Sequence, residues 1–315
     1  LFDQKRPHEA LTAYLRAAEL DPDYAIAHFD VGKTLETLRR ESEAVECYRR
    51  AHAIDPTGDA PREALVRALE SAGRRDEALG ELRAWLSACP GHPLAEHLLA
   101  AMGGTEAPAR ASDAYVRGTF DRFAADFDQT LERLQYRAPR VLAAALDARL
   151  GERRGLAILD AGCGTGLCGP LIIARARVLD GVDLSAGMLD RARDRGVYTA
   201  LHEAELTTYL RDHEGIYDVI LSADTFCYFG ALRDLCVAAH AALRPDGVLA
   251  FTVEHHTGEG EHALHVAGRY AHAPGYVLTT LSDAGFRDHS CDEVVLRYEG
   301  GAPVHGLVVL ATRHA

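Results

Sequence analysis

Short apolar runs alternate with segments of helical periodicity from residue 156 to the end of the chain. The runs are typical of buried strands, and they cover residues 156–160, 178–183, 217–223 and 247–254. Between them, apolar residues recur every three or four positions, as at 186–195 and 231–243, which indicates helices. The alternation predicts an α/β domain in which a parallel sheet carries helices on both faces and binds ligands at the carboxyl ends of its strands.

The C-terminal segment breaks this alternation. Two strand-like runs, residues 288–298 and 304–312, follow one another and are joined by a turn containing EGGAP. Two such runs joined by a short turn rich in glycine and proline are typical of an antiparallel hairpin. We therefore expect the sheet to close with an antiparallel hairpin.

The first hundred residues carry a helical pattern that repeats every 34 residues. The positions that keep this spacing are Pro22, Pro56 and Pro90; Ala10, Ala44 and Ala78; Tyr14, Tyr48 and Leu82; and Ala17, Ala51 and Trp85. Small alanines let two helices cross closely, and a proline ends the second helix of each unit. The pattern resembles the tetratricopeptide repeat, which implies an all-α repeat domain over residues 1–102 with a capping helix at 92–102.

The repeat domain is expected to end in a linker and to bind a partner. Residues 103–112, GGTEAPARAS, have the composition of a linker, so the α/β domain spans residues 113–315. Repeat solenoids mostly present a concave binding face, so we expect a protein or peptide partner there. The charged side chains expected to face that groove are Lys33, Glu36, Arg67 and Glu70. Self-association into a homodimer is the alternative use of these repeats.

Composition narrows the classes of partner. The formal net charge of -13 disfavours general binding to nucleic acid, which depends on neutralising phosphates with lysine and arginine. No apolar stretch approaches the length of a membrane-spanning helix, and the N-terminal residues show no signal-peptide pattern. The seven cysteines are an odd number without paired CxxC spacing, as in a reduced protein. We therefore expect a cytoplasmic protein that binds neither nucleic acid nor a membrane.

The stretch ILDAGCGTGLCGP, residues 158–170, follows the first predicted strand and fits two glycine templates. Gly164, Gly166 and Gly169 fit the GxGxxG of dinucleotide sites, whereas Asp160 with Gly162, Gly164 and Gly166 fits DxGxGxG. A dinucleotide places its pyrophosphate on this turn, where the charge of Asp160 would repel it. Asp160 suits instead a ligand with a cationic group, such as the α-ammonium of S-adenosylmethionine.

A second acid, Asp183, closes the next predicted strand 21 residues after Gly162. It can accept hydrogen bonds from both ribose hydroxyls, a device that NAD enzymes share. The following LSAGMLDRAR, the later LRPDGVLAFTVE and the closing hairpin resemble the corresponding segments of class I S-adenosylmethionine-dependent methyltransferases. The resemblance covers about residues 113–315. It implies a Rossmann-like sheet and S-adenosylmethionine as the cofactor.

The resemblance also implies the residues that bind the cofactor. They are Tyr115, Arg117, Asp160, Gly162, Gly164, Gly166, Asp183, Leu184, Met188, Glu205, Ser222 and Asp224. The first acid would lie near the methionine amine, the glycines would admit the backbone close to methionine and ribose, and the second acid would hold the ribose hydroxyls. Leu184 and Met188 would flank the adenine, and Glu205, with Glu203 as the alternative, would accept its amine. Ser222 and Asp224 would close the fourth strand over the sulfonium.

The segment before the glycine strand is unusually aromatic, with rings at 115, 120, 123, 127 and 136. The resemblance implies that residues 113–136 form a lid that orders when the cofactor binds and excludes water during transfer. Tyr115 and Arg117 would contact the cofactor. The alternative is that the aromatic side chains pack permanently onto the sheet, which we expect for Phe123 and Phe127.

The acceptor is expected beside DTFCYFG, after the fourth strand, and EHHTGEGEHALHVAGRYAHAPGY, after the fifth. The second stretch holds histidines at 255, 256, 262, 265 and 272, but no cysteine or aspartate completes a ligand set, so we expect no metal. Arg269 and His272 would bind an acceptor carboxylate or take its proton, with Tyr270 as a wall. Three cysteines near the site are interpreted as small space-filling side chains: Cys163, Cys168 and Cys227.

The chemistry of the acceptor decides whether a general base is needed. A protonated phenol or amine needs one, and the candidates by residue type are His255, His256, His272 and Tyr228. A carboxylate is already charged at neutral pH, so Arg269 would only have to position it. The sequence does not choose between these cases.

Taken together, these patterns predict an enzyme that moves the methyl group of S-adenosylmethionine to an unidentified acceptor. The repeats would recruit a protein that is the acceptor or carries it. One alternative is a small-molecule O-methyltransferase, acting on a carboxylate or hydroxyl, whose repeats serve self-association. The others are a non-catalytic S-adenosylmethionine sensor and an NAD-dependent oxidoreductase.

Overall fold

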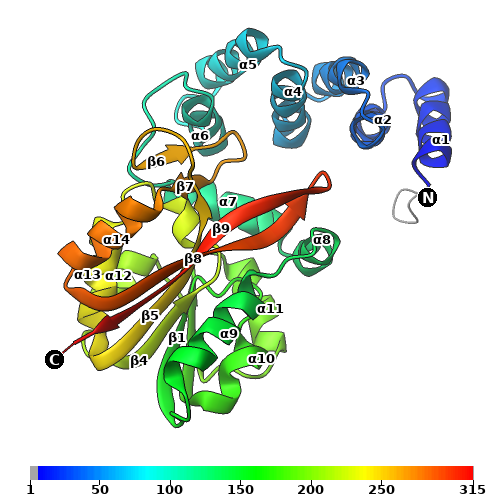
Figure 1. The fold of residues 1–315 in the computed structure, drawn as a ribbon. Coiled ribbons are helices and arrows are strands. Elements are labelled where there is room, and N and C mark those ends of the chain that lie inside the picture. The colour runs from blue at the N-terminus through cyan, green and yellow to red at the C-terminus, as the bar shows by residue number, and fades with distance from the viewer. Residues whose placement is uncertain (1–5, 315) are drawn as a thin grey trace. The chain divides into compact units, whose positions relative to one another are not determined.

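The computed structural model describes residues 6–314, which divide into two compact units (Figure 1). The first unit ends at Thr105 and the second begins at Glu106. Among the described residues, no helix is both long and apolar enough to cross a membrane.

The first unit is built from helices alone, and each packs against the next along the chain. They are α1 (Pro7–Leu20), α2 (Ala25–Thr37), α3 (Glu41–Ile54), α4 (Asp59–Ser71), α5 (Arg75–Ala88) and α6 (Pro93–Ala101). The repeated alanines Ala44 and Ala78 are fully buried, as is Tyr48. A Cβ on Gly32 would lie 2.6 Å from the ring of Tyr48, so only glycine lets α2 and α3 approach this closely. The all-α repeat prediction is therefore confirmed.

Charged side chains expected in the groove form contacts within the repeat unit. Glu36 on α2 accepts a hydrogen bond from the hydroxyl of Tyr48 at 2.7 Å. On α4, Glu70 lies 2.9 Å from Arg75 and is only 19% exposed. These two carboxylates are therefore engaged inside the unit, and their use toward a partner stays a prediction.

The second unit contains the predicted sheet. Its parallel strands are β1 (Leu156–Ala161), β2 (Ala176–Asp183), β3 (Ala200–Glu203), β4 (Tyr217–Ser222) and β5 (Leu243–His255), in the order β3-β2-β1-β4-β5. The antiparallel hairpin of β8 (Phe286–Glu299) and β9 (Ala302–Arg313) joins it, because β9 pairs with β5 from Val248↔Thr312 to Glu254↔Gly306. Both the parallel sheet and the closing hairpin were predicted correctly.

Helices cover both faces of this sheet, as the alternating pattern predicts. One face packs with α12 (Leu206–Arg211), α13 (Arg233–Ala242) and α14 (Pro274–Asp283), and the other with α9 (Ala138–Leu150) and α10 (Gly169–Ile172). Helices α7 (Asp113–Phe123), α8 (Phe127–Arg133) and α11 (Ala186–Asp194) complete the unit. The two faces hold separate apolar clusters, so β1, β4 and β5 are buried on both sides.

A short hairpin was not predicted. Strands β6 (His262–Leu264) and β7 (Tyr270–His272) pair with each other, and β7 extends the sheet by pairing with the end of β5 (Figure 1). No strand was predicted in this stretch. Tyr270 and His272 are fully buried in it, so the hairpin belongs to the core.

Part of the expected linker is bound to the second unit. The N–H of Ala111 donates to the carbonyl of Tyr228 at 2.8 Å, and the hydroxyl of Tyr270 donates to the carbonyl of Pro108 at 2.6 Å. Residues 108–111 therefore form a fixed strap beside the loop that follows β4. The predicted linker over 103–112 contains the boundary between the two units, and its residues 108–111 are hydrogen-bonded to the second unit.

Candidate active site

The glycine turn lies at the carboxyl ends of β1 and β2. The N–H groups of Gly162 and Cys163 donate to the carbonyl of Val182, at 2.8 and 3.0 Å, which ties the turn to the neighbouring strand. Gly162 has φ +72°, and a Cβ there would lie 2.1 Å from the hydroxyl oxygen of Thr225. Gly164 has φ +53°, but a Cβ there would meet no protein atom within 4 Å. The turn thus needs glycine for its own packing at one position and opens toward free space at the other.

Asp183, at the end of β2, faces the turn. One carboxylate oxygen accepts from the N–H of Gly164 at 2.8 Å, and the other accepts from the N–H of Ser185 at 2.9 Å. Burial raises the pKa of Asp183, and these backbone donors act against that rise. Each carboxylate oxygen can accept a second hydrogen bond, so the group is fixed in place and can still receive two hydroxyls.

Asp160, at the end of β1, is only 1% exposed. The hydroxyl of Tyr198 donates to its carboxylate at 2.6 Å. Burial raises the pKa of Asp160 to about 7, the Tyr198 hydrogen bond acts against this rise, and the nearby charge of Asp183 adds to it. A cation beside Asp160 would restore its charge, so the position suits an ammonium group.

The expected adenine contacts are only partly in place. Leu184 is half-buried, and its carbonyl accepts from Nε of Arg117 at 3.2 Å, whereas Met188 is fully buried. Glu205 caps α12 by accepting from the N–H groups of Thr207 and Thr208, at 3.0 and 2.8 Å. The structure thus gives Glu205 a helix-capping role that the sequence analysis did not assign. Glutamate is not one of the residues preferred at the N-cap, so the sequence carried no clear capping signal here.

The aromatic segment forms α7 and α8, which are held onto the cofactor side by two acids. Asp121 accepts from the hydroxyl of Ser185 at 2.5 Å, and Asp128 accepts from the hydroxyl of Thr165 in the glycine turn at 2.5 Å. The expectation that Phe123 and Phe127 pack onto the sheet is wrong: they pack against each other with ring centroids 5.9 Å apart, and Phe123 is 41% exposed. Tyr115, which was expected to contact the cofactor, is buried, with 5% of its surface exposed. Ordering of this lid on cofactor binding stays a prediction.

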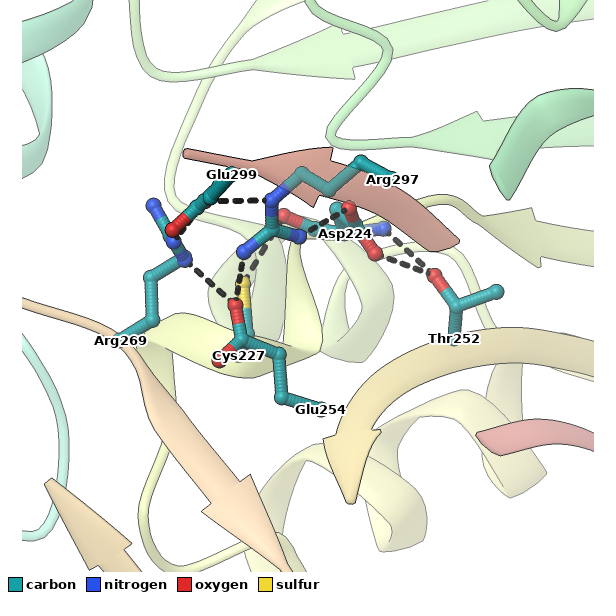
Figure 2. Close-up of polar contacts among 7 residues, drawn as sticks. All are labelled: Asp224, Cys227, Thr252, Glu254, Arg269, Arg297 and Glu299. Carbon is teal, nitrogen blue, oxygen red and sulfur yellow. Dashed lines mark hydrogen bonds and ion pairs between the residues drawn. The ribbon is translucent and has the colours of Figure 1, made fainter. Parts of the chain in front are cut away.

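Five charged side chains form a network beyond the end of β4 (Figure 2). They are Asp224, Glu254, Arg269, Arg297 and Glu299, which we call the charge network. Nε of Arg269 lies 2.6 Å from Glu254 Oε1, and Nη2 of Arg269 lies 2.7 Å from Glu299 Oε1. Arg297 contacts Glu299 Oε1 with its Nε at 2.7 Å, Asp224 with its Nη1 at 3.3 Å, and Glu254 with its Nη2. The two guanidinium groups thus share two carboxylates.

The charge network is buried and is fixed from several strands. Arg297 from β8 is 5% exposed and Glu254 from β5 is 12% exposed. Burial raises the pKa of Asp224, although Arg297 and the hydroxyl of Thr252 act against this rise. Burial also acts to raise the pKa of Glu254, but Arg269 and Arg297 outweigh it and hold that pKa below its usual value. Its charged form is therefore stabilised by the arginines.

Comparisons with known proteins agree with this geometry. Residues 158–247 match the family model of a methyltransferase domain, and residues 1–38 and 59–102 match models of the tetratricopeptide repeat. The chain joins tetratricopeptide repeats to a class I methyltransferase domain. The cofactor of this domain is S-adenosylmethionine, as predicted. The site formed by Asp160, Gly164 and Asp183, which we call the cradle, fits this cofactor. Gly164 leaves room beside Asp183, and the buried carboxyl of Asp160 suits a cation.

Curated relatives match part of the chain. Human methyltransferase-like protein 27 is 36% identical over 141 residues, which are 42% of this chain and 55% of the relative. Malonyl-[acyl-carrier protein] O-methyltransferase of Acetivibrio thermocellus is 33% identical over 140 residues, which are 44% of this chain and 48% of the relative. The chain therefore spans about half the length of the curated relatives it matches.

Solved structures show the same fold. The 1,6-didemethyltoxoflavin-N1-methyltransferase of Burkholderia thailandensis, with bound S-adenosylhomocysteine, superposes with a TM-score of 0.51 at 22% identity. That match covers 67% of this chain and 94% of the other. Magnesium protoporphyrin IX methyltransferase of Synechocystis superposes with a TM-score of 0.51 at 17% identity, over 64% of this chain and all of the other.

The three histidines predicted as general bases are held in contacts within the methyltransferase domain. His272 is fully buried, and its Nε2 donates to the carbonyl of Phe229 at 2.8 Å. Burial lowers the pKa of His272 to about 4, so the ring is neutral at physiological pH. His255 lies 3.4 Å from Glu293, and His256 contacts the carbonyl of Glu259 at 3.0 Å. These contacts do not support the roles that the sequence analysis gave to the three histidines.

Other predicted residues have structural roles. Ser222 is fully buried, and its hydroxyl donates to the carbonyl of Ala161 at 2.7 Å, so it joins β4 to β1. Burial raises the pKa of Tyr228 well above its ordinary value, which makes it a poor base. The guanidinium of Arg269, which was expected to bind an acceptor carboxylate, is ion-paired with Glu254 and Glu299. Burial also raises the thiol pKa values of three cysteines, in keeping with space-filling roles: Cys163, Cys168 and Cys227.

A hollow of about 470 Å³ adjoins the charge network. Its lining side chains include Glu254, His255, Glu293 and His305. Glu293 lies 2.9 Å from Nδ1 of His305, so the hollow is polar on one side. In the part of the chain that the structure describes, no group of three or more histidine, cysteine, aspartate or glutamate side chains is arranged to hold a metal ion.

Gly164→Ala is expected to abolish cofactor binding with little loss of stability. The new methyl group meets no protein atom within 4 Å, but it enters the space beside Asp183. Its positive φ costs about 1 kcal/mol of folding free energy in alanine. Gly215→Ala is the matched control, because Gly215 has φ +64° and equally open surroundings at an exposed turn. Titration with S-adenosylhomocysteine and thermal unfolding measure both effects. Equal binding by the two variants would contradict the assigned site.

Proposed function

We propose that this protein transfers a methyl group from S-adenosylmethionine to an acceptor that its repeat unit recruits. The observation that carries the proposal is the cradle formed by Asp160, Gly164 and Asp183 at adjacent strand ends. A fixed carboxylate that can receive two hydroxyls and a buried acid suited to a cation match the ribose and the ammonium of this cofactor. A nicotinamide dinucleotide would bring its pyrophosphate to the side of Asp160, which disfavours that alternative.

The residues of this chain have distinct tasks in the transfer. Asp183 holds the ribose hydroxyls, Asp160 holds the ammonium, and the open face at Gly164 admits the nucleoside. The bound cofactor supplies an activated methyl group on a sulfonium. The protein then has to align the acceptor with that methyl group and exclude water. Helices α7 and α8, held by Asp121 and Asp128, would exclude water.

Affinity for S-adenosylhomocysteine is expected to rise with pH between about 6 and 8. The pKa of Asp160 is raised to about 7 by burial, and the ligand's ammonium favours its charged form, so binding releases a proton. The stability of the protein without ligand changes with pH in the opposite direction. Folding favours the neutral form of Asp160, so the free energy of unfolding falls as the pH rises from its ordinary pKa of 3.8 toward its raised pKa of about 7. Calorimetry in buffers of different ionisation enthalpy measures the released proton. Asp160→Asn is expected to remove the pH slope, and an unchanged slope would contradict the role of Asp160.

The repeat unit is proposed to recruit the acceptor or its carrier, since tetratricopeptide repeats generally mediate protein interactions. A chain that starts at residue 103 keeps the strap at 108–111 and all of the cradle. It is expected to bind S-adenosylhomocysteine normally, while KM for the natural acceptor in a lysate rises roughly tenfold or more and kcat is largely kept.

A longer deletion serves as the control for the chain that starts at residue 103. A chain that starts at residue 113 also loses the strap that holds the Tyr228 and Tyr270 region. It is therefore expected to lose kcat as well. Transfer of label from the cofactor to lysate fractions separated by size follows both chains. If the chain from residue 103 keeps full efficiency and only changes from dimer to monomer, the repeats serve self-association instead.

A further inference from the structure

Glu299 differs from the other carboxylates of the charge network in where it comes from. It is the last residue of β8 and is followed by Gly300 and Gly301, which both have positive φ. Its side chain is 41% exposed, against 12% for Glu254 and 16% for Asp224. The hairpin end thus carries a carboxylate inward to buried arginines, and this carboxylate is the most accessible of the three.

The position of Glu299 is that of a bridging anion. Its Oε1 lies 2.7 Å from Nη2 of Arg269 and 2.7 Å from Nε of Arg297 (Figure 2). Two guanidinium groups that converge on one oxygen form a strong site for a carboxylate, because each contributes a charge-assisted hydrogen bond. Arg269 and Arg297 would offer the same site to any carboxylate that replaced Glu299.

Charge balance shows which carboxylate can leave. Two arginines face three acids, so the charge network carries one net negative charge with Glu299 and none without it. Asp224 and Glu254 are buried, and removing either from the arginines would leave an unpaired charge in the interior. Glu299 can turn outward into water, and an incoming carboxylate then restores the original balance. Replacing one carboxylate of the charge network by an incoming carboxylate therefore costs the least free energy at Glu299.

We propose that Arg269 and Arg297 bind a carboxylate of the methyl acceptor, and that Glu299 occupies this site until the acceptor displaces it. The proposal rests on the proposed function, since the site adjoins the end of β4, where the acceptor is expected. Glu299 is then a residue that determines specificity, because an acceptor without a negative charge gains nothing by displacing it.

Two further observations support the exchange. The hollow of about 470 Å³ is lined by Glu254 from the charge network and by Pro303 and Val304 from the facing strand of the hairpin. It therefore offers space for an acceptor next to the Glu254 side of the charge network. Three of the four predicted bases, the histidines, are held in other contacts, and a carboxylate acceptor needs no base, because it is already ionised at neutral pH.

Malonate is a suitable probe, with malonamide as its neutral counterpart. Both are titrated into the full chain at about pH 8, with and without saturating S-adenosylhomocysteine. Glu299→Gln is expected to bind malonate at least tenfold more tightly than the unmodified chain, and to bind malonamide no better. Glu293→Gln is the matched control, because Glu293 lies on the same strand and contacts His255 and His305 instead of the arginines. It is expected to leave malonate binding unchanged.

A second variant ties the effect to the arginines. Arg269→Gln, added to Glu299→Gln, is expected to remove the gain in malonate affinity. Arg269→Lys, which keeps the charge but loses the fork of donors, is expected to restore part of it, so a misfolded variant is distinguished from a missing donor. Equal malonate affinity of Glu299→Gln and the unmodified chain would overturn the proposal, as would a gain that survives the loss of Arg269.

The two claims fail in different ways. If S-adenosylhomocysteine does not bind but Glu299→Gln still gains malonate affinity, the proposed function is wrong and the anion site stands. If S-adenosylhomocysteine binds and the gain is missing, the displacement of Glu299 is wrong and the proposed function stands.

Discussion

Arg297→Met is expected to lower the free energy of unfolding of the methyltransferase domain by about 3–5 kcal/mol. Arg297 is 5% exposed and contacts Asp224, Glu254 and Glu299. Methionine keeps much of the side-chain volume of arginine. It leaves Arg269 as the one remaining arginine of the charge network, facing carboxylates that are buried. A buried charge without its partner is far more costly than the pair is stabilising, so the effect is expected to exceed that of an ordinary ion pair.

Chemical denaturation followed by circular dichroism measures this loss. Trp85, the single tryptophan of the sequence, lies in α5, so its fluorescence follows the repeat unit separately. Arg193→Met is the control: Arg193 is 63% exposed and pairs with Asp190 on the surface of α11, so its loss is expected to cost less than about 1 kcal/mol. A loss of similar size in both variants would show that the charge network is not a buried unit.

The pH dependence of the Arg297→Met effect has a defined sign. The arginines hold the pKa of Glu254 below its usual value, so the stability from this pairing is present at neutral pH and fades as the pH falls through that pKa. The variant loses much of this stabilisation from the start. The difference between the two proteins is therefore expected to shrink in acid.

Asp183→Ala is expected to weaken S-adenosylhomocysteine binding by about 2–3 kcal/mol, roughly 30- to 150-fold. The substitution removes the acceptor for two ribose hydroxyls. It also frees the N–H of Gly164 and the N–H of Ser185, which the carboxylate now holds at 2.8 and 2.9 Å. The loss therefore combines missing ligand contacts with a less ordered glycine turn.

Calorimetric titration measures the affinity, and Asp190→Ala is the control. Asp190 lies nearby on α11 but is 73% exposed, so its removal is expected to leave binding unchanged. If Asp183→Ala binds as tightly as the unmodified chain, the ribose is held by other residues.

The fold could be predicted because its signals are local and periodic. The 34-residue spacing places Ala44, Ala78 and Tyr48 in one buried layer, and Gly32 fits against the Tyr48 ring. The apolar runs of the second unit became β1, β4 and β5 because a strand buried on both faces must be apolar throughout. The run at 178–183 became β2, which is buried only in part. The cradle followed from the fold, since Asp160 lies next to the last residue of β1 and Asp183 is the last residue of β2.

The charge network could not be predicted from local patterns. Glu254 and Arg297 are 43 residues apart and meet only when β9 inserts between β5 and β8. A signal was present, because Arg297 and Glu299 alternate on one side of a strand that is otherwise expected to be half apolar. In the structure these two residues form an ion pair. The strand in the histidine-rich stretch could not be predicted for the same reason. β7 is only three residues long and forms through its pairing with β5 and β6, not through a pattern in its own sequence.

The central claim is that the cradle formed by Asp160, Gly164 and Asp183 binds S-adenosylmethionine rather than a nicotinamide dinucleotide. Titration of the full chain with S-adenosylhomocysteine and, separately, with NAD tests this most directly. We predict saturable binding of S-adenosylhomocysteine in the micromolar range and no heat with NAD. Saturable binding of NAD with no response to S-adenosylhomocysteine would contradict the account.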